Sequence, residues 1–228
     1  MTSPNCGKRR GGVTPDIIVI HYTGMASCAE ARARLCDPLA EVSAHWLVDL
    51  DGTCDALVPE DLRAWHAGAG EWAGVTDVNS ASIGIELANP GNAPFPHRQM
   101  VGLEVLLGGI MDRWRVPPHR VIGHSDMAPM RKRDPGPRFD WRGLARAGLS
   151  VWPGAGEADP AGFSGDARRF GYADVPPDVL LAAFRLRFRP WATGPVDPTD
   201  AGMAADLALR FRAAQAAIQG DVTRPGLA

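Results

Sequence analysis

The chain has 228 residues, of which 45% are hydrophobic and 22% charged, so it can form one globular domain with a sizeable core plus a smaller second domain. Its formal net charge of −2 excludes the strongly basic surface that selects phosphate backbones, so we expect no nucleic-acid partner. No apolar run approaches the ~20 residues that span a bilayer, so we expect no membrane partner either.

The beginning of the chain and the cysteines bear on the cellular compartment. The segment MTSPNCGKRRGG lacks the apolar core that an export signal needs. The four cysteines form no CxxC pair, which argues against a zinc knuckle and against a dense disulfide framework. We therefore expect a cytoplasmic protein with reduced thiols. The sequence does not indicate its oligomeric state.

In chain order, short apolar runs that end at turn residues predict β-strands. They lie within residues 16–24, 42–52, 81–89 and 119–126. The Asp51-Gly52 pair predicts a hairpin. Before the last of these runs, residues 97–115 carry apolar side chains at helical spacing, which predicts a long helix packed on the sheet. We expect an α/β fold with a mixed central β-sheet flanked by helices.

The composition of the sequence changes at residues 152–162. This stretch is rich in glycine and proline and has no hydrophobic periodicity, which indicates a linker. Further helices are predicted within residues 159–172, 176–190 and 200–220. We therefore predict a larger domain at residues 1–152, a linker at residues 153–159 and a helical module at residues 160–228. The module either is independent or is a bundle that only covers apolar surface of the larger domain.

Two histidines come directly after predicted strands. His21 follows an apolar run, and so does His124, which places both imidazoles at the carboxyl ends of strands, where open sheets with parallel strands bind ligands. Asp134 is the nearest carboxylate fixed by a following proline, in a stretch, residues 123–136, that prolines and glycine are expected to keep from being a helix. Two imidazoles and one carboxylate with an open fourth position are typical of a catalytic zinc site. The sequence therefore predicts bound Zn²⁺.

Two more charged residues are expected beside this metal. In the run 82–87, Glu86 alternates with apolar residues, so its carboxylate lies opposite the apolar face and can line a cleft. Lys132 points the same way as Asp134 if that segment is extended. Each residue also has a simpler interpretation: a hydrogen-bonded structural histidine, an exposed carboxylate, a solvated charge run or a plain turn. Spacing alone is weak evidence for a site.

Three other residues are candidates for contacts near the site. His45 lies inside a predicted strand, where a structural role or one behind the metal ligands is expected. His66 and Trp72 fall in a Gly-rich loop, where exposed aromatic residues more often contact sugar or peptide than pack in a core. We therefore expect His66 and Trp72 to bind substrate or to support the ligands.

Five segments, in this order, resemble the motif series of the zinc-dependent N-acetylmuramoyl-L-alanine amidase family (amidase-2), which includes the AmpD and AmiD amidases. They are IVIHYTG, VSAHWLVDLDG, AWHAGAGEWAG, NSASIGIELAN and VIGHSDMAPMRKRDPGPRFDW. The resemblance covers roughly residues 13–150. It implies zinc ligation by His21, His124 and Asp134 and catalytic roles for Glu86 and Lys132. The C-terminal helices resemble in part the peptidoglycan-binding module of some AmiD-like amidases.

The resemblance implies hydrolysis of the amide between the lactyl group of N-acetylmuramic acid and L-alanine of the stem peptide, so a muropeptide is the expected substrate. A cytoplasmic amidase meets turnover fragments with a 1,6-anhydro sugar, which predicts a role in peptidoglycan recycling. Two alternatives stay open: a periplasmic amidase acting on the intact wall, and a muropeptide-binding sensor with a structural zinc. Neither the accepted stem-peptide length nor the strictness for the anhydro sugar follows from the sequence.

Overall fold

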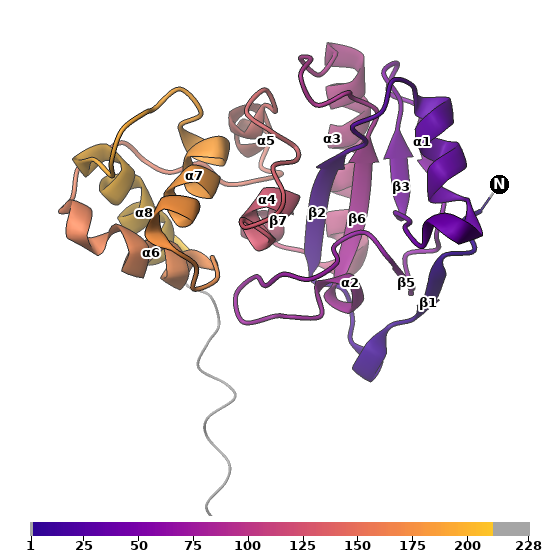
Figure 1. The fold of residues 1–228 in the computed structure, drawn as a ribbon, viewed down its shortest axis with the longest axis horizontal. Coiled ribbons are helices and arrows are strands. Elements are labelled where there is room, and N and C mark those ends of the chain that lie inside the picture. The colour runs from indigo at the N-terminus through magenta and orange to yellow at the C-terminus, as the bar shows by residue number, and fades with distance from the viewer. Residues whose placement is uncertain (1, 212–228) are drawn as a thin grey trace, which may run out of the picture.

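The central element of the fold is a five-stranded mixed sheet, seen in a computed structural model that describes residues 2–211 (Figure 1). The strand order is β4-β3-β6-β2-β7, and only β4 runs antiparallel to its neighbour. The strands are β2 (Ile17–Tyr22), β3 (Trp46–Val48), β4 (Cys54–Ala56), β6 (Ser82–Leu87) and β7 (Val121–Gly123). A small second sheet pairs β1 (Cys6–Lys8) with β5 (Leu62–Ala64).

Helices surround the central sheet. They are α1 (Cys28–Leu35), α2 (Val78–Ala81), α3 (His97–Trp114), α4 (His124–Met127), α5 (Trp141–Arg146), α6 (Phe163–Phe170), α7 (Pro177–Phe188) and α8 (Pro198–Arg210). Figure 1 shows α6, α7 and α8 grouped on the β7 side of the sheet, with α4 and α5 between them and the strands. None of the helices within residues 2–211 is long and apolar enough to cross a bilayer.

The predicted α/β class is confirmed by this mixed sheet with its flanking helices. Each predicted strand region contains a strand, and the predicted long helix is α3. The Asp51-Gly52 pair forms the β3–β4 hairpin, where Gly52 adopts a φ of 92° that favours glycine. The helices α6, α7 and α8 lie within the three predicted helical regions, and the part of the last region beyond residue 211 lies outside the described residues.

One expectation about the local structure is wrong. Residues 123–136 were expected to contain no helix, yet α4 forms a helical turn at the start of this stretch. The backbone N–H of Gly123 donates to the carboxylate of Asp126 at 2.8 Å, which caps the turn before Pro129 is reached. A single capped turn fits between the glycine and the proline that prevent a longer helix.

The two faces of the sheet bury different neighbours. On one face, Ile20 and Ile85 share a core with apolar residues of α3 and α5. On the other face, Ile17 and Val19 share a core with the C-terminal helices. The members that those helices contribute to this core include Phe163, Phe170, Leu180, Phe184, Phe188 and Leu207. One continuous core therefore joins the sheet to α6–α8.

The predicted linker, residues 153–159, contains neither helix nor strand. It lies against α8, because the N–H of Gly154 donates to Asp206 at 2.8 Å and the N–H of Ala158 donates to the carbonyl of Pro198 at 3.0 Å. The division into domains at this segment stays a prediction.

Candidate metal centre and active site

The candidate site begins at the carboxyl ends of β2 and β6. These parallel strands pair in a register that places His21 opposite Glu86. Side chains of paired residues leave the sheet on the same face, so the imidazole and the carboxylate emerge side by side. This is the face away from α3. Ile17 and Ser82, four residues earlier on the two strands, share it.

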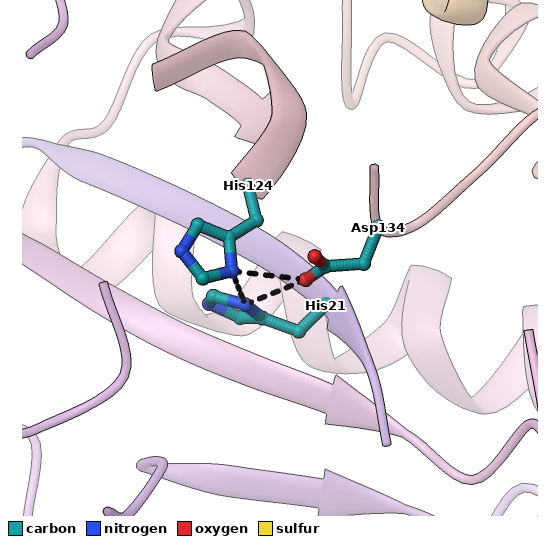
Figure 2. Close-up of side chains that lie close together, drawn as sticks. All are labelled: His21, His124 and Asp134. Atoms are coloured by element: carbon teal, nitrogen blue, oxygen red, sulfur yellow. Dashed lines mark hydrogen bonds and ion pairs between the residues drawn. The ribbon is translucent and has the colours of Figure 1, made fainter. Parts of the chain in front are cut away.

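Three side chains converge on one point at this edge (Figure 2). His21 comes from β2, His124 is the first residue of α4, and Asp134 lies in the loop that follows. The two Nδ1 atoms are 2.8 Å apart, and each is 3.0 Å from Oδ2 of Asp134. All three residues are buried. The structure thus brings together the three residues predicted as metal ligands.

The hydrogen bond on the far side of the His124 ring fixes its tautomer. Nε2 of His124 lies 2.9 Å from the backbone carbonyl of Ala67. A carbonyl oxygen only accepts, so Nε2 carries the hydrogen and donates it. In the neutral ring, Nδ1 is then left with a free lone pair that points toward His21 and Asp134.

A chain of side chains fixes the tautomer of His21. Nε2 of His21 lies 3.0 Å from Nδ1 of His66, and Nε2 of His66 lies 3.2 Å from Oγ of Ser82. The Ser82 hydroxyl donates to the carbonyl of Val78, so its oxygen accepts from His66. Each ring therefore donates from Nε2, and His21 keeps a lone pair on Nδ1.

Gly84 gives the His66 ring its place over the sheet. A Cβ atom at residue 84 would lie 2.3 Å from Cγ of His66, closer than real contacts allow. The ring therefore packs directly on the β6 backbone, within reach of both His21 and Ser82.

This donor set suits a cation. Two nitrogen lone pairs and a carboxylate oxygen lie within 2.8–3.0 Å of one another, and no ring hydrogen points between them. Burial, aided by the nearby His124, lowers the pKa of His21 to about 4, so the imidazole is neutral near pH 7. Two imidazoles and one carboxylate match the ligands of open catalytic zinc sites. A bound metal ion would relieve the repulsion among these lone pairs.

Glu86 is a carboxylate without a hydrogen-bond partner on one oxygen. Its Oε2 is buried and lacks a partner among the described residues. Burial raises the pKa of Glu86 to about 8, with a further contribution from Asp134 and an opposing one from Lys132. A carboxyl group whose pKa lies near neutrality can both release and take up a proton at physiological pH.

A cleft of about 470 Å³ opens above these groups and gives them access to a ligand. Lys132 lines the cleft beside Asp134, and α1 contributes one wall through Arg34. Tyr22 and Trp65 add aromatic surface to the lining. The predicted catalytic pair, Glu86 and Lys132, therefore shares one cleft with the three candidate ligands.

The remaining sequence candidates lie in different places. His66 contacts His21 and lines the cleft. His45 is fully buried behind His66, where its Nδ1 accepts from the N–H of Gly84 at 2.9 Å and its Nε2 donates to the carbonyl of Leu62 at 3.0 Å. Ser82, which ends the chain from His21, was not predicted. Its signal in the sequence is that it shares a strand face with Glu86, four residues away.

The expectation for Trp72 needs correction. This residue is only 1% exposed, and its ring packs edge-on against Phe170 and Tyr172, with centroid distances of 5.5 and 5.1 Å. It is absent from the lining of the cleft. Burial by residues far along the chain turns this loop tryptophan into a core residue, so it does not contact substrate.

Comparison with known families identifies the chain. A family model described as N-acetylmuramoyl-L-alanine amidase matches residues 11–137, more than half of the chain. The chain belongs to this amidase family. The amidase is 37% identical over 210 residues to the N-acetylmuramoyl-L-alanine amidase AmiD of Escherichia coli K12, covering 76% of this chain and 75% of AmiD. It is 41% identical over 100 residues to the 1,6-anhydro-N-acetylmuramyl-L-alanine amidase AmpD of Enterobacter cloacae, which covers 44% of this chain and 54% of AmpD.

Solved structures extend the likeness beyond the family match. The amidase superposes on E. coli AmiD in complex with anhydro-N-acetylmuramic acid-L-Ala-D-gamma-Glu-L-Lys with a TM-score of 0.79 and 33% identity, covering 90% of this chain and 93% of that one. Pseudomonas aeruginosa AmpDh3 in complex with an anhydromuramic pentapeptide gives a TM-score of 0.74 and 29% identity, covering 93% and 96%. Coverage this high includes part of the C-terminal helical region.

Proposed function

We propose that this amidase is a zinc enzyme that hydrolyses the amide between the lactyl group of 1,6-anhydro-N-acetylmuramic acid and L-alanine in soluble muropeptides. The observation that carries the proposal is the convergence of His21 Nδ1, His124 Nδ1 and Asp134 Oδ2 in the cleft that Glu86, with its unpartnered Oε2, also lines. The substrate is supported by the relatives, because the AmiD and AmpDh3 complexes hold anhydromuramic peptides and the name of AmpD specifies the 1,6-anhydro sugar.

Zinc fits the three candidate ligands better than a hard cation does. Magnesium and calcium prefer oxygen ligands, whereas two of the three donors here are imidazole nitrogens. When bound at such a site, zinc lowers the pKa of a coordinated water to about 7 and polarises a carbonyl group. In this proposal His21, His124 and Asp134 hold the ion.

Glu86 supplies the proton transfers. Its carboxylate takes a proton from the attacking water as the water oxygen bonds to the lactyl carbonyl carbon. It then gives that proton to the nitrogen of L-alanine as the carbon–nitrogen bond breaks. The second proton of the water passes from the new carboxyl group to the amine, so the products are a lactyl carboxylate and an ammonium group. Burial raises the pKa of this carboxyl in the metal-free protein, and a bound cation beside it would favour the ionised form that acts as the base.

Lys132 stabilises the charge that develops on the substrate. As the carbonyl carbon becomes tetrahedral, its oxygen gains negative charge that is absent from the bound substrate. Lys132 lines the same cleft as Glu86 and carries a positive charge. A cation placed where charge develops lowers the barrier more than it strengthens substrate binding.

Metal analysis of the purified protein tests the zinc assignment. We expect about one zinc per chain by elemental analysis, and we expect chelation to remove hydrolysis of an anhydromuropeptide and added Zn²⁺ to restore it. A protein that turns over this substrate without any transition metal would contradict the proposal.

Paired substrates test the proposed specificity. Soluble anhydromuropeptides should be cleaved faster than intact sacculi, and the lactyl–alanine bond should be the one that breaks, as mass spectrometry of the products can establish. Equal cleavage of both would favour an enzyme of the intact wall. The cytoplasmic compartment stays a prediction, and fractionation of cells that express the native full-length chain would test it.

A further inference from the structure

Beneath His124 lies a buried ion pair that joins two distant parts of the chain. Arg187, in the last turn of α7, places Nη1 2.7 Å from Oδ2 of Asp126 in α4. Both side chains are 1% exposed. The pair thus connects the C-terminal helices to the helical turn whose first residue is the candidate ligand His124.

The hydrogen bonds described for the Asp126 carboxylate hold it against the helical turn α4. Oδ2 also accepts from the N–H of Gly123 at 2.8 Å, which caps α4 immediately before His124. Oδ1 accepts from the hydroxyl of Tyr172 at 2.7 Å. Tyr172 lies just beyond the end of α6, so a second C-terminal segment holds the same carboxylate.

Arg187 also holds the strand that leads into the turn. Its Nη2 donates to the carbonyl of Val121 in β7 at 3.0 Å and to the hydroxyl of Ser150 at 3.2 Å. Its guanidinium stacks over the ring of Trp141, 4.3 Å from the centroid. One side chain therefore fixes both the strand before His124 and, through Asp126, the helical turn that begins at His124.

Stability alone does not account for this arrangement. A buried ion pair contributes little net free energy of folding, because the desolvation of both charges offsets their attraction. Replacing such a pair by apolar residues of similar volume is often neutral or stabilising. Unlike apolar groups, the charged groups make directional hydrogen bonds to the backbone around His124. The carboxylate accepts from the N–H of Gly123, and the guanidinium donates to the carbonyl of Val121.

We infer that Asp126, Tyr172 and Arg187 are positioning residues that hold His124 in the geometry needed for metal binding. In this inference the C-terminal helices help to hold the metal centre in place. The inference rests on the proposed function, because it takes His124 as a ligand. Residues that orient metal ligands in this way typically change metal affinity by about 10- to 100-fold when they are altered.

The chain offers a matched control in the same helix. Arg185 is also buried in α7 and forms an ion pair, with Asp200, at 3.1–3.2 Å from its Nε. Its Nη2 also donates to Oδ2 of Asp200 at 2.5 Å, and its remaining hydrogen bonds go to the carbonyls of Gly194 and Pro195. None of these partners belongs to β7, α4 or the loop that carries Asp134, so Arg185→Lys perturbs α7 without touching the support of His124.

The test compares Arg187→Lys and Tyr172→Phe with Arg185→Lys in the full-length chain. Zinc dissociation constants are measured by competition with a chelator, and the unfolding of each metal-free variant is measured in denaturant. We expect zinc affinity to fall about 10- to 100-fold for Arg187→Lys and less for Tyr172→Phe, and to stay within about twofold of the parent for Arg185→Lys. Hydrolysis by the first two variants should recover at excess zinc, because Glu86 and Lys132 are untouched.

Unchanged zinc affinity in Arg187→Lys and Tyr172→Phe would overturn the inference, and so would an equal loss in Arg185→Lys at equal stability. If Arg187→Lys does not fold, the zinc affinity of Tyr172→Phe tests the inference by itself. This variant loses only one hydroxyl group and should therefore fold. Failure of the proposed function gives a different result: His124→Ala would then keep its zinc, whatever the positioning variants do.

Discussion

The two faces of the central sheet carry alternate residues of the same strands, yet they contribute different properties. On the α3 face, Ile20 and Ile85 are fully buried among apolar side chains, each contributing about 1.5–3 kcal/mol through burial. On the opposite face, His21 and Glu86 occupy a place where burial costs free energy unless each polar group is paired. The alternation of a strand thus places stabilising residues and reactive residues on opposite faces of one short segment.

The largest effect should come from removing one ligand. His124→Ala should abolish both zinc binding and hydrolysis, because two remaining ligands hold zinc poorly. Elemental analysis and turnover of an anhydromuropeptide measure the two losses. The control variant is His97→Ala. His97 is exposed at the start of α3, on the opposite face of the sheet, so this variant should keep both zinc binding and hydrolysis. Turnover retained by His124→Ala would show that another residue completes the site.

Removal of the proton-transfer group should have the next largest effect. Glu86→Ala should lower the rate by roughly 10²- to 10⁴-fold while zinc content and substrate affinity stay close to those of the parent. Single-turnover kinetics and equilibrium binding separate the two quantities. Glu104→Ala, a carboxylate removed from α3, should leave the rate unchanged. Loss of zinc in Glu86→Ala would instead make Glu86 a ligand, and an unchanged rate would show that another group performs the proton transfers.

Changes on the α3 face should affect stability rather than chemistry. Ile85→Ala should lower the free energy of unfolding by about 2–5 kcal/mol, because it leaves a cavity in a fully buried core. Denaturant unfolding measures this loss. Val105→Ala, on the exposed side of α3, should change stability by no more than about 0.5 kcal/mol. If the folded Ile85→Ala protein binds zinc much more weakly, the two faces are not independent.

The smallest effect should come from the end of the hydrogen-bond chain behind His21. Ser82→Ala removes the acceptor for His66, so the orientation of His21 is held less firmly and zinc affinity should fall by roughly 10-fold. Ser80→Ala is the matched control, since the hydroxyl of this buried serine accepts from the backbone N–H of Arg10 and not from His66. An equal loss of affinity in both variants would show that the chain does not orient His21.

Much of the sheet and its edge could be predicted from the sequence, because the relevant signals are local. Apolar runs that end at His21 and His124 placed both histidines at strand ends, and alternation placed Glu86 away from the apolar face. Asp134 was a candidate as the nearest carboxylate before a proline, and the resemblance to the amidase family singled it out. The placement of His21, His124 and Glu86 needs only the strand period and the way in which parallel strands share an edge.

Other features could not be predicted, because they depend on contacts between distant residues. Trp72 was expected to be exposed in its Gly-rich loop, but residues about 100 positions later bury it. The contact of His66 with His21 spans 45 residues, and no local pattern selects that partner over the substrate. The helical turn of α4 depends on the side chain of Asp126, which caps it. The nearby proline and glycine predicted a loop, so the sequence pattern did not indicate this cap.

The hydrogen bonds of Asp126 have a consequence for the order in which the amidase matures during translation. The partners Tyr172 and Arg187 lie 46 and 61 residues after Asp126 in the chain. At about 5–20 residues per second, the ribosome makes Asp126 several seconds before it makes Arg187. Until Arg187 is made, the carboxylate of Asp126 lacks its ion-pair partner at the turn that bears His124. A ribosome that stops before codon 187 therefore releases a fragment with every candidate metal ligand but without the arginine that completes the support of His124.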